Sequence, residues 1–303
     1  MNIIELQNLT KSFGKLVAVK DLSLAVPKGS IYGFIGPNGS GKTTTLRMIM
    51  RIMYPDSGTI LINGQPHTSS RPENIGYLPE DRGLYKKMKV TDLLHFYGEL
   101  SNGTYNKDKI DYWLKKLDLF DRKEKKVETF SKGMRQKLQF IATVLNQPEI
   151  IILDEPFSGL DPVNAEVLKD SILELQKEGS TIIFSTHDMS MAEKMCDYIF
   201  MIYNGEKVLD GTLYNIQENY GNDTIRIQTA LGQAALKGLT GIEKINDYGK
   251  LQELRLLPDA DTNKILTEVL TRTTVSKFEV TSPSLNDIFI RIASPDKKEL
   301  IHE

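Results

Sequence analysis

The chain is short of cysteine, of long apolar runs and of net charge. Cys196 is the only cysteine among 303 residues, so no internal disulfide can form, and we expect a protein of the reducing cytoplasm. No apolar stretch approaches the roughly 18 residues that a membrane-spanning helix needs. The first residues, MNIIELQNLTKSFGK, lack the basic start and the apolar core of a signal peptide. Any membrane crossing is therefore expected in another chain.

The near balance of positive and negative charges bears on which partners the chain is expected to bind. A formal net charge of −2 gives no support for binding nucleic acid through bulk charge, so we expect no nucleic-acid partner. The length leaves room for one large and one small domain and for a sizeable core.

The first 220 residues alternate strands and helices. Short β-rich runs divided by Gly, Pro and Asn occupy residues 1–64, with one helix predicted from Gly41 to Pro55. Residues 81–147 show amphipathic patterns and are predicted to form a helical insertion. The runs EIIILDEP and STIIFSTH are short enough for strands buried on both faces, and a helix follows each. This alternation predicts an α/β fold, a parallel sheet with helices on both faces.

The pattern changes after residue 220. The segments from TIRIQT to VSKFEVT follow the order β-α-β-β-α-β, which is the split βαβ or ferredoxin-like order. A last helix, SLNDIFIRIA, and a polar tail, DKKELIHE, complete the chain. We therefore predict an α/β domain at 1–220 and a separate small α+β domain at 221–303.

A phosphate-binding loop is predicted after the strand IYGFI. Residues 36–43, GPNGSGKT, match the pattern G-x-x-x-x-G-K-[ST] at the start of a helix. Glycines let successive backbone N–H groups point inward, and the helix N-terminus favours a phosphate through its dipole. Lys42 can then reach the β- and γ-phosphates, and Thr43 can ligate Mg²⁺. The alternative is a chance glycine-rich turn, which the flanking strand and helix disfavour.

Two acids and a histidine follow neighbouring strands. Asp154 ends the run IIILD and can hold Mg²⁺ at the carboxyl edge of the sheet, while Glu155 can orient or activate water. The alternative is a solvated acidic loop, which the phosphate loop disfavours. His187 ends STIIFSTH at the same edge, and we expect it to contact the γ-phosphate or water, although a single histidine is more often structural.

A second turn before a helix, FSKGMRQ at 130–136, completes an ordered set of motifs. GPNGSGKTT, YLPE, FSKGM, IIILDEP, SGLD and His187 occur in that order. Over residues 1–220 the set resembles the nucleotide-binding subunit of an ATP-binding cassette (ABC) transporter. In that family the six elements are called, in the same order, Walker A, Q-loop, signature, Walker B, D-loop and switch histidine. The resemblance implies a P-loop NTPase with a RecA-like core, an antiparallel β subdomain and a helical insertion.

The resemblance also implies roles for individual residues. ATP and Mg²⁺ are the implied ligands, with Glu155 and His187 catalytic. Thr43, Glu80 and Asp154 are implied to ligate the metal. Phe13 would stack on adenine, and its alternative is a core Phe in a strand. The implied nucleotide contacts are Phe13, Gly36, Asn38, Gly39, Ser40, Gly41, Lys42, Thr43, Thr44, Ser131 and Gly133.

Two motifs depart from the commonest family pattern. Glu80 stands where Gln is usual, and Lys132 and Met134 replace Gly and Gln in the signature. Both variants are similar to those of drug-, sodium- and polymer-exporter ATPases. The segment TSPSLNDIFIRIA resembles part of an accessory domain of that branch. For this domain we expect a structural or dimer-supporting role. We expect Lys132 either to add charge toward phosphate or to be solvated.

The implied partners are a second subunit and a permease. Two copies, or a copy and a paralogue, would pack head to tail so that Ser131 and Gly133 meet ATP held by the partner. A separate transmembrane permease would place the chain at the inner face of the cell membrane and export a solute. Tyr85 and Met88 either contact that permease or belong to a solvated basic loop. The main alternative function is a non-transport ABC ATPase acting on nucleic acid or ribosomes; a P-loop kinase would leave FSKGM and SGLD unexplained.

Overall fold

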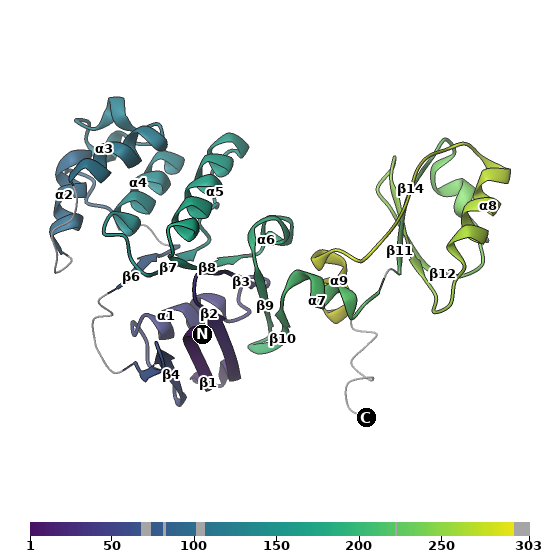
Figure 1. The fold of residues 1–303 in the computed structure, drawn as a ribbon, viewed down its shortest axis with the longest axis horizontal. Coiled ribbons are helices and arrows are strands. Elements are labelled where there is room, and N and C mark those ends of the chain that lie inside the picture. The colour runs from purple at the N-terminus through teal and green to yellow at the C-terminus, as the bar shows by residue number, and fades with distance from the viewer. Residues whose placement is uncertain (68–73, 81–82, 101–106, 222, 294–303) are drawn as a thin grey trace. The chain divides into compact units, whose positions relative to one another are not determined.

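The structure, a computed structural model, describes residues 1–67, 74–80, 83–100, 107–221 and 223–293 (Figure 1). Parts of the predicted helical insertion, at 81–82 and 101–106, and the predicted polar tail lie outside these residues. The chain divides into two compact units, Met1–Thr212 and Leu213–Glu303. Within the described residues, no helix has the length and apolar character required to cross a bilayer.

A six-stranded sheet forms the centre of the N-terminal unit, and its strand order is β10-β9-β3-β8-β7-β6. Neighbouring strands from β9 to β6 are parallel, and β10 pairs antiparallel with β9. The middle strands are buried along their whole length, as their largely apolar sequences predict. The strands are β3 (Ile31–Ile35), β6 (Ile75–Leu78), β7 (Ile150–Asp154), β8 (Thr181–Thr186), β9 (Tyr198–Tyr203) and β10 (Glu206–Gly211).

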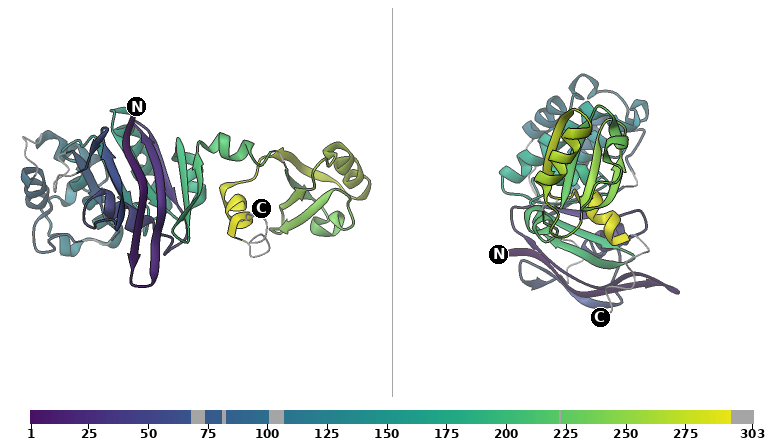
Figure 2. Two further views of the ribbon diagram at one scale, coloured as in Figure 1. Left: turned by 90° about the horizontal axis from the view of Figure 1, so that it is seen from below. Right: turned by 90° about the vertical axis from the view of Figure 1, so that its right-hand side faces the viewer.

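A second, antiparallel sheet has the order β2-β1-β4-β5. Its first two strands form the long hairpin seen in Figure 2. The strands are β1 (Asn2–Phe13), β2 (Leu16–Pro27), β4 (Ser57–Ile62) and β5 (Gln65–Pro66). This sheet is the antiparallel β subdomain that the sequence predicts.

Side chains of the central strands alternate between two cores. Tyr32 and Phe34 pack with the antiparallel sheet and α1 (Lys42–Ile49), whereas Ile31 packs on the opposite side. On that side, helices of the insertion and α5 cover the sheet (Figure 1). The covering helices are α2 (Val90–Leu100), α3 (Lys107–Lys116), α4 (Lys132–Val144) and α5 (Pro162–Lys177), and α6 (Met189–Met195) follows β8.

The first helix is shorter than the sequence predicts. We expected it to continue to Pro55, but α1 ends at Ile49. Arg51 has a φ of 52°, a left-handed conformation that stops the helix, and its backbone N–H bonds back to the Met48 carbonyl. The Arg51 guanidinium donates to the carbonyl of His67 at 2.8 Å, a contact distant in sequence that no local pattern reveals.

The C-terminal unit is an antiparallel sheet of order β12-β13-β11-β14 with one long helix, α8 (Thr262–Arg272), against it. The elements follow the predicted split βαβ order, but its first predicted helix is only a 3-10 turn, η3 (Gly232–Leu236). Gly232 and Gly238 have φ values of 54° and 73°, so left-handed residues bracket this turn. The strands are β11 (Thr224–Thr229), β12 (Ile242–Asp247), β13 (Gln252–Leu256) and β14 (Val275–Thr281).

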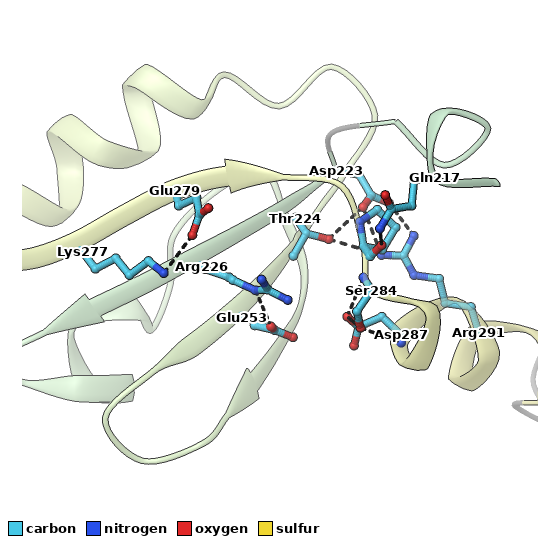
Figure 3. Close-up of polar contacts among 11 residues, drawn as sticks. Gln217, Asp223, Thr224, Arg226, Glu253, Lys277, Glu279, Ser284, Asp287 and Arg291 are labelled. Atoms are coloured by element: carbon cyan, nitrogen blue, oxygen red, sulfur yellow. Dashed lines mark hydrogen bonds and ion pairs between the residues drawn. The ribbon is translucent and has the colours of Figure 1, made fainter. Parts of the chain in front are cut away.

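Polar contacts fasten two further helices, α7 (Leu213–Glu218) and α9 (Leu285–Ala293), within the C-terminal unit (Figure 3). The Arg291 guanidinium on α9 donates to both carboxylate oxygens of Asp223, at 2.6 and 3.0 Å. Gln217 on α7 donates to the carbonyl of Pro283 at 3.0 Å. The first contact ties α9 to the start of β11, and the second ties α7 to the segment just before α9.

Candidate functional site

The phosphate loop lies between β3 and α1. Gly36 and Gly41 have φ values of 153° and 111°, and each backbone is closely approached. A Cβ at Gly36 would lie 2.3 Å from the Ile202 carbonyl oxygen, and one at Gly41 would lie 2.5 Å from that of Ala18. Both positions therefore require glycine, which gives the loop its curl and its inward-pointing N–H groups.

Lys42 lies inside this curl. Its residue is only 5% exposed, and its ammonium donates to the carbonyl oxygens of Gly36 at 2.7 Å and of Pro37 at 3.1 Å. Burial lowers the pKa of Lys42, while the carboxylates of Glu155, Asp154 and Glu80 act in the opposite direction. A buried ammonium at the start of a helix, inside a glycine-rich loop, is suited to contact a polyphosphate.

Asp154 joins the loop to the end of β7. It is fully buried, and its Oδ1 accepts hydrogen bonds from the hydroxyls of Thr43, at 3.3 Å, and Ser185. Its Oδ2 is buried and has no hydrogen-bond partner among the described residues. An unpaired buried carboxylate oxygen is costly, and a hard cation beside the Thr43 hydroxyl would satisfy it. The donor set therefore fits Mg²⁺, with nucleotide phosphate oxygens as further ligands.

Glu155 and His187 meet at the same edge of the sheet. Nδ1 of His187 lies 2.9 Å from Oε1 of Glu155, and the backbone N–H of Glu155 donates to the Ser185 hydroxyl at 3.1 Å. Glu155 has a φ of 50°, a left-handed conformation unusual for glutamate, while the His187 side chain is 61% exposed. The carboxylate is thus held in place beside an exposed imidazole, as a group that receives a proton from water requires.

The remaining predicted contacts surround the loop. Phe13, at the tip of the first hairpin, is 47% exposed, so the alternative of a core phenylalanine is wrong. Asn38 and Gly39 are exposed, whereas the hydroxyl of Ser40 is buried and without a described partner. Thr44 is half-buried on α1.

Glu80 is exposed two residues after β6, and its carboxylate acts on the site by raising the pKa of Lys42.

Ser131 and Gly133 belong to a different surface. The Ser131 hydroxyl caps α4 by accepting from the backbone N–H of Met134 at 3.2 Å, and no contact described here joins Ser131 or Gly133 to the phosphate loop. Instead, α4 is fastened to the segment after Glu155. The side chain of Gln136 donates to the Pro156 carbonyl at 2.6 Å. The Lys137 ammonium donates to the amide oxygen of Asn164 at 2.9 Å.

Lys132 packs on the SGLD segment, a contact that the sequence analysis missed. A Cβ placed on Gly159 would lie 2.8 Å from Cε and 3.1 Å from Nζ of Lys132. The lysine therefore occupies the space that a side chain at residue 159 would need. Ser185 was missed too, although the parallel pairing of β7 with β8 places it directly beside Asp154 and could have indicated it.

Comparisons with known proteins match two parts of the chain to family models. A family model described as ABC transporter matches residues 19–158, and one described as ATP-binding protein DrrA1-3-like, C-terminal domain, matches residues 211–293. YhaQ of Bacillus subtilis (strain 168), an ABC transporter ATP-binding protein, is 38% identical over 95% of this chain and 97% of its own length. LnrL of the same organism, a linearmycin resistance ATP-binding protein, is 31% identical over 96% of this chain and 98% of its own.

A solved ATP-binding subunit of an ABC transporter superposes with a TM-score of 0.66 at 29% identity, over 72% of this chain and 93% of that one. The P-loop NTPase fold expected from the motifs is thereby confirmed. The chain belongs to the family of ABC transporter ATP-binding proteins, ATPases that hydrolyse ATP to power transport.

Proposed function

We propose that ATP with Mg²⁺ binds at the loop between β3 and α1, and that its hydrolysis drives export through a separate membrane permease. The observation that carries the proposal is the unpaired, buried oxygen of Asp154 beside the Thr43 hydroxyl, with Glu155 and His187 next to it. Export is supported by similarity to LnrL, whose name refers to resistance to linearmycin.

Each part of the site has a distinct task in the proposed reaction. The loop N–H groups and Lys42 bind the phosphates, and Phe13 offers an exposed ring to adenine. Thr43 and Asp154, with Glu80 at the edge of the site, hold Mg²⁺, which when bound neutralises developing phosphate charge. Glu155 then accepts a proton from the attacking water while His187 orients it.

A head-to-tail dimer would complete the nucleotide site. Ser131 and Gly133 lie at the start of α4, where backbone N–H groups and a hydroxyl can meet the γ-phosphate of ATP held by a partner subunit. ATP would favour the closed dimer, because the γ-phosphate gains these contacts only there. This arrangement accounts for a second anion-binding helix start outside the Lys42 pocket.

The permease contact is proposed at Tyr85 and Met88, which would hold the chain peripherally at the inner face of the cell membrane. Tyr85 is 55% exposed, and Met88 is half-buried against the core of the helical insertion. An exposed aromatic ring beside a partly buried methionine is suited to a protein partner.

The test is to purify the full chain from membranes and identify what accompanies it. A multi-span membrane protein that co-purifies, together with Mg²⁺-dependent ATP turnover, would support the proposal. Co-purification of ribosomes or nucleic acid in place of a membrane protein would overturn it in favour of a non-transport ABC ATPase.

A further inference from the structure

Two basic segments that are far apart in the sequence lie side by side in the helical insertion. Residues 83–89, GLYKKMK, and residues 121–129, DRKEKKVET, hold seven basic and three acidic residues. This local surplus of four positive charges contrasts with the net charge of −2 for the whole chain. Positive charge is therefore concentrated in these two segments.

Backbone hydrogen bonds join the segments into an antiparallel pair, which we call the basic ribbon (residues 83–91 and 121–129). Lys89 and Lys126 form a β-bridge at its centre. Four N–H groups donate across the pair: Glu128 to Lys86 at 2.8 Å, Val127 to Met88 at 3.0 Å, Val90 to Lys125 at 3.1 Å and Thr91 to Lys123 at 3.0 Å. The lysines are thus carried on an ordered backbone.

The ribbon has an apolar side and a charged side. Leu84, Val90 and Val127 are buried in the core of the helical insertion. The exposed residues on the ribbon include Lys86, Lys87, Lys89, Arg122, Lys125 and Lys126. Because the apolar side chains anchor the ribbon, its cations are presented together toward solvent.

Only part of this charge is neutralised locally. Lys89 pairs with Glu124 at 3.1 Å, and Lys126 lies 3.8 Å from Glu128. Among the described residues, no carboxylate lies within 4.0 Å of the cationic groups of Lys86, Lys87, Arg122 or Lys125. The surplus is available to a negatively charged surface.

An exposed aromatic ring adjoins these cations. The Tyr85 ring stands edge-on against Phe96, with their centroids 5.5 Å apart. Tyrosine beside lysine is the combination that favours the boundary between lipid headgroups and water, since the ring is amphipathic and the ammonium seeks phosphate.

We propose that the basic ribbon binds the anionic headgroups of membrane lipids next to the permease. The proposal rests on the proposed function for placing the ribbon near a membrane. Six of its seven cations are lysines, and an ammonium is a compact charge without the planar fork with which arginine grips one carboxylate. A lysine cluster therefore suits a layer of mobile phosphates better than an acidic segment of one protein.

The test measures binding of the full chain alone, without nucleotide or permease, to phosphatidylcholine vesicles with and without phosphatidylglycerol. We expect binding only to the anionic vesicles, and loss of that binding at high salt. The triple variant Lys86→Gln, Lys87→Gln, Lys125→Gln should bind these vesicles about 10–100-fold more weakly. Circular dichroism checks that the variant is folded.

The matched control changes three exposed lysines elsewhere, Lys177→Gln, Lys237→Gln and Lys250→Gln, and should bind like the wild type. Equal binding by wild type and ribbon variant, or no preference of the wild type for anionic vesicles, overturns the inference. Lost co-purification of the permease in detergent by a ribbon variant, with unchanged vesicle binding, would assign the ribbon to an acidic protein partner instead. ATP turnover is measured separately, so failure of the proposed function remains distinguishable.

Discussion

At the scale of single residues, Asp154 and Glu155 show how two consecutive acids come to lie in different environments. Asp154 is the last residue of β7 and is fully buried between two hydroxyl donors, so its carboxylate is fixed. Glu155 turns out of the strand with a φ of 50° and meets an exposed histidine. The first environment suits a metal ligand, and the second suits a group that exchanges a proton with water.

Glu155→Gln should separate binding from hydrolysis. The amide keeps the shape of the side chain but cannot accept a proton, so kcat for ATP should fall about 10²–10⁴-fold. ATP affinity, measured by calorimetry with Mg²⁺, should stay close to that of the wild type, because Lys42 and the loop are unchanged. The control Glu166→Gln alters an exposed glutamate on α5 and should keep full turnover. Wild-type kcat in Glu155→Gln would remove Glu155 from the role of proton acceptor.

The sequence predicted such positions only where a motif fixes the residue on a known kind of element. Asp154 ends a strand, Lys42 and His187 follow one, and the common edge of a parallel sheet brings the three together. The placement of Lys132 against Gly159 depends on how α4 packs on a segment more than twenty residues later. No local pattern contains that information.

At the scale of elements, β3 shows how tightly the central sheet is packed. Gly33 lies at its middle, and a Cβ there would lie 2.5 Å from the Sγ of Cys196, at the end of α6. Burial raises the pKa of the Cys196 thiol well above its ordinary value, so it stays protonated and behaves as a small apolar group. Gly33 is therefore required for the approach of α6 and not for an unusual backbone angle.

Gly33→Ala should lower the free energy of unfolding by about 1–3 kcal/mol through overpacking. Adding Cys196→Ala removes the sulfur from the same space, so the double variant should recover much of this loss, with a coupling energy of about 0.5–3 kcal/mol. Urea denaturation of the four proteins in the cycle gives the value. Gly83→Ala, whose Cβ would meet no described atom within 4 Å, should change stability little. Strictly additive effects of Gly33→Ala and Cys196→Ala would show that the two residues do not compete for space.

Elements were predicted best where burial and periodicity agree. The strands β7 and β8 and the helix α5 have strong apolar patterns or a clear Asp-Pro start, and the structure contains them. The predicted lengths of α1 and η3 were wrong. The left-handed residue Arg51 stops α1, and the left-handed residue Gly232 shortens η3, although the composition of both segments would allow a longer helix. A φ value above zero at arginine is set by tertiary contacts such as its bond to the His67 carbonyl.

At the scale of the whole molecule, the two units have separate cores. Within the described residues, the apolar clusters of the N-terminal unit are formed by residues before 203, and that of the C-terminal unit by Ile225, Leu254, Val269 and their neighbours. The C-terminal unit also has its own ion pair between Arg291 and Asp223, in which the Arg291 side chain is only 9% exposed. Separate cores predict separate unfolding transitions.

Calorimetry of Glu155→Gln should therefore show two transitions that respond to different changes. ATP with Mg²⁺ at 100 times its Kd stabilises the unit that binds it by about 2.7 kcal/mol, which should raise only the N-terminal transition by about 5–11 °C. Arg291→Met leaves Asp223 without its partner and should lower only the C-terminal transition, by at least about 4 °C, since a lost charged hydrogen-bond pair costs about 1–3 kcal/mol. A single transition that both changes shift by similar amounts would mean that the units unfold as one, and the ligand's free energy would then be shared across the whole chain.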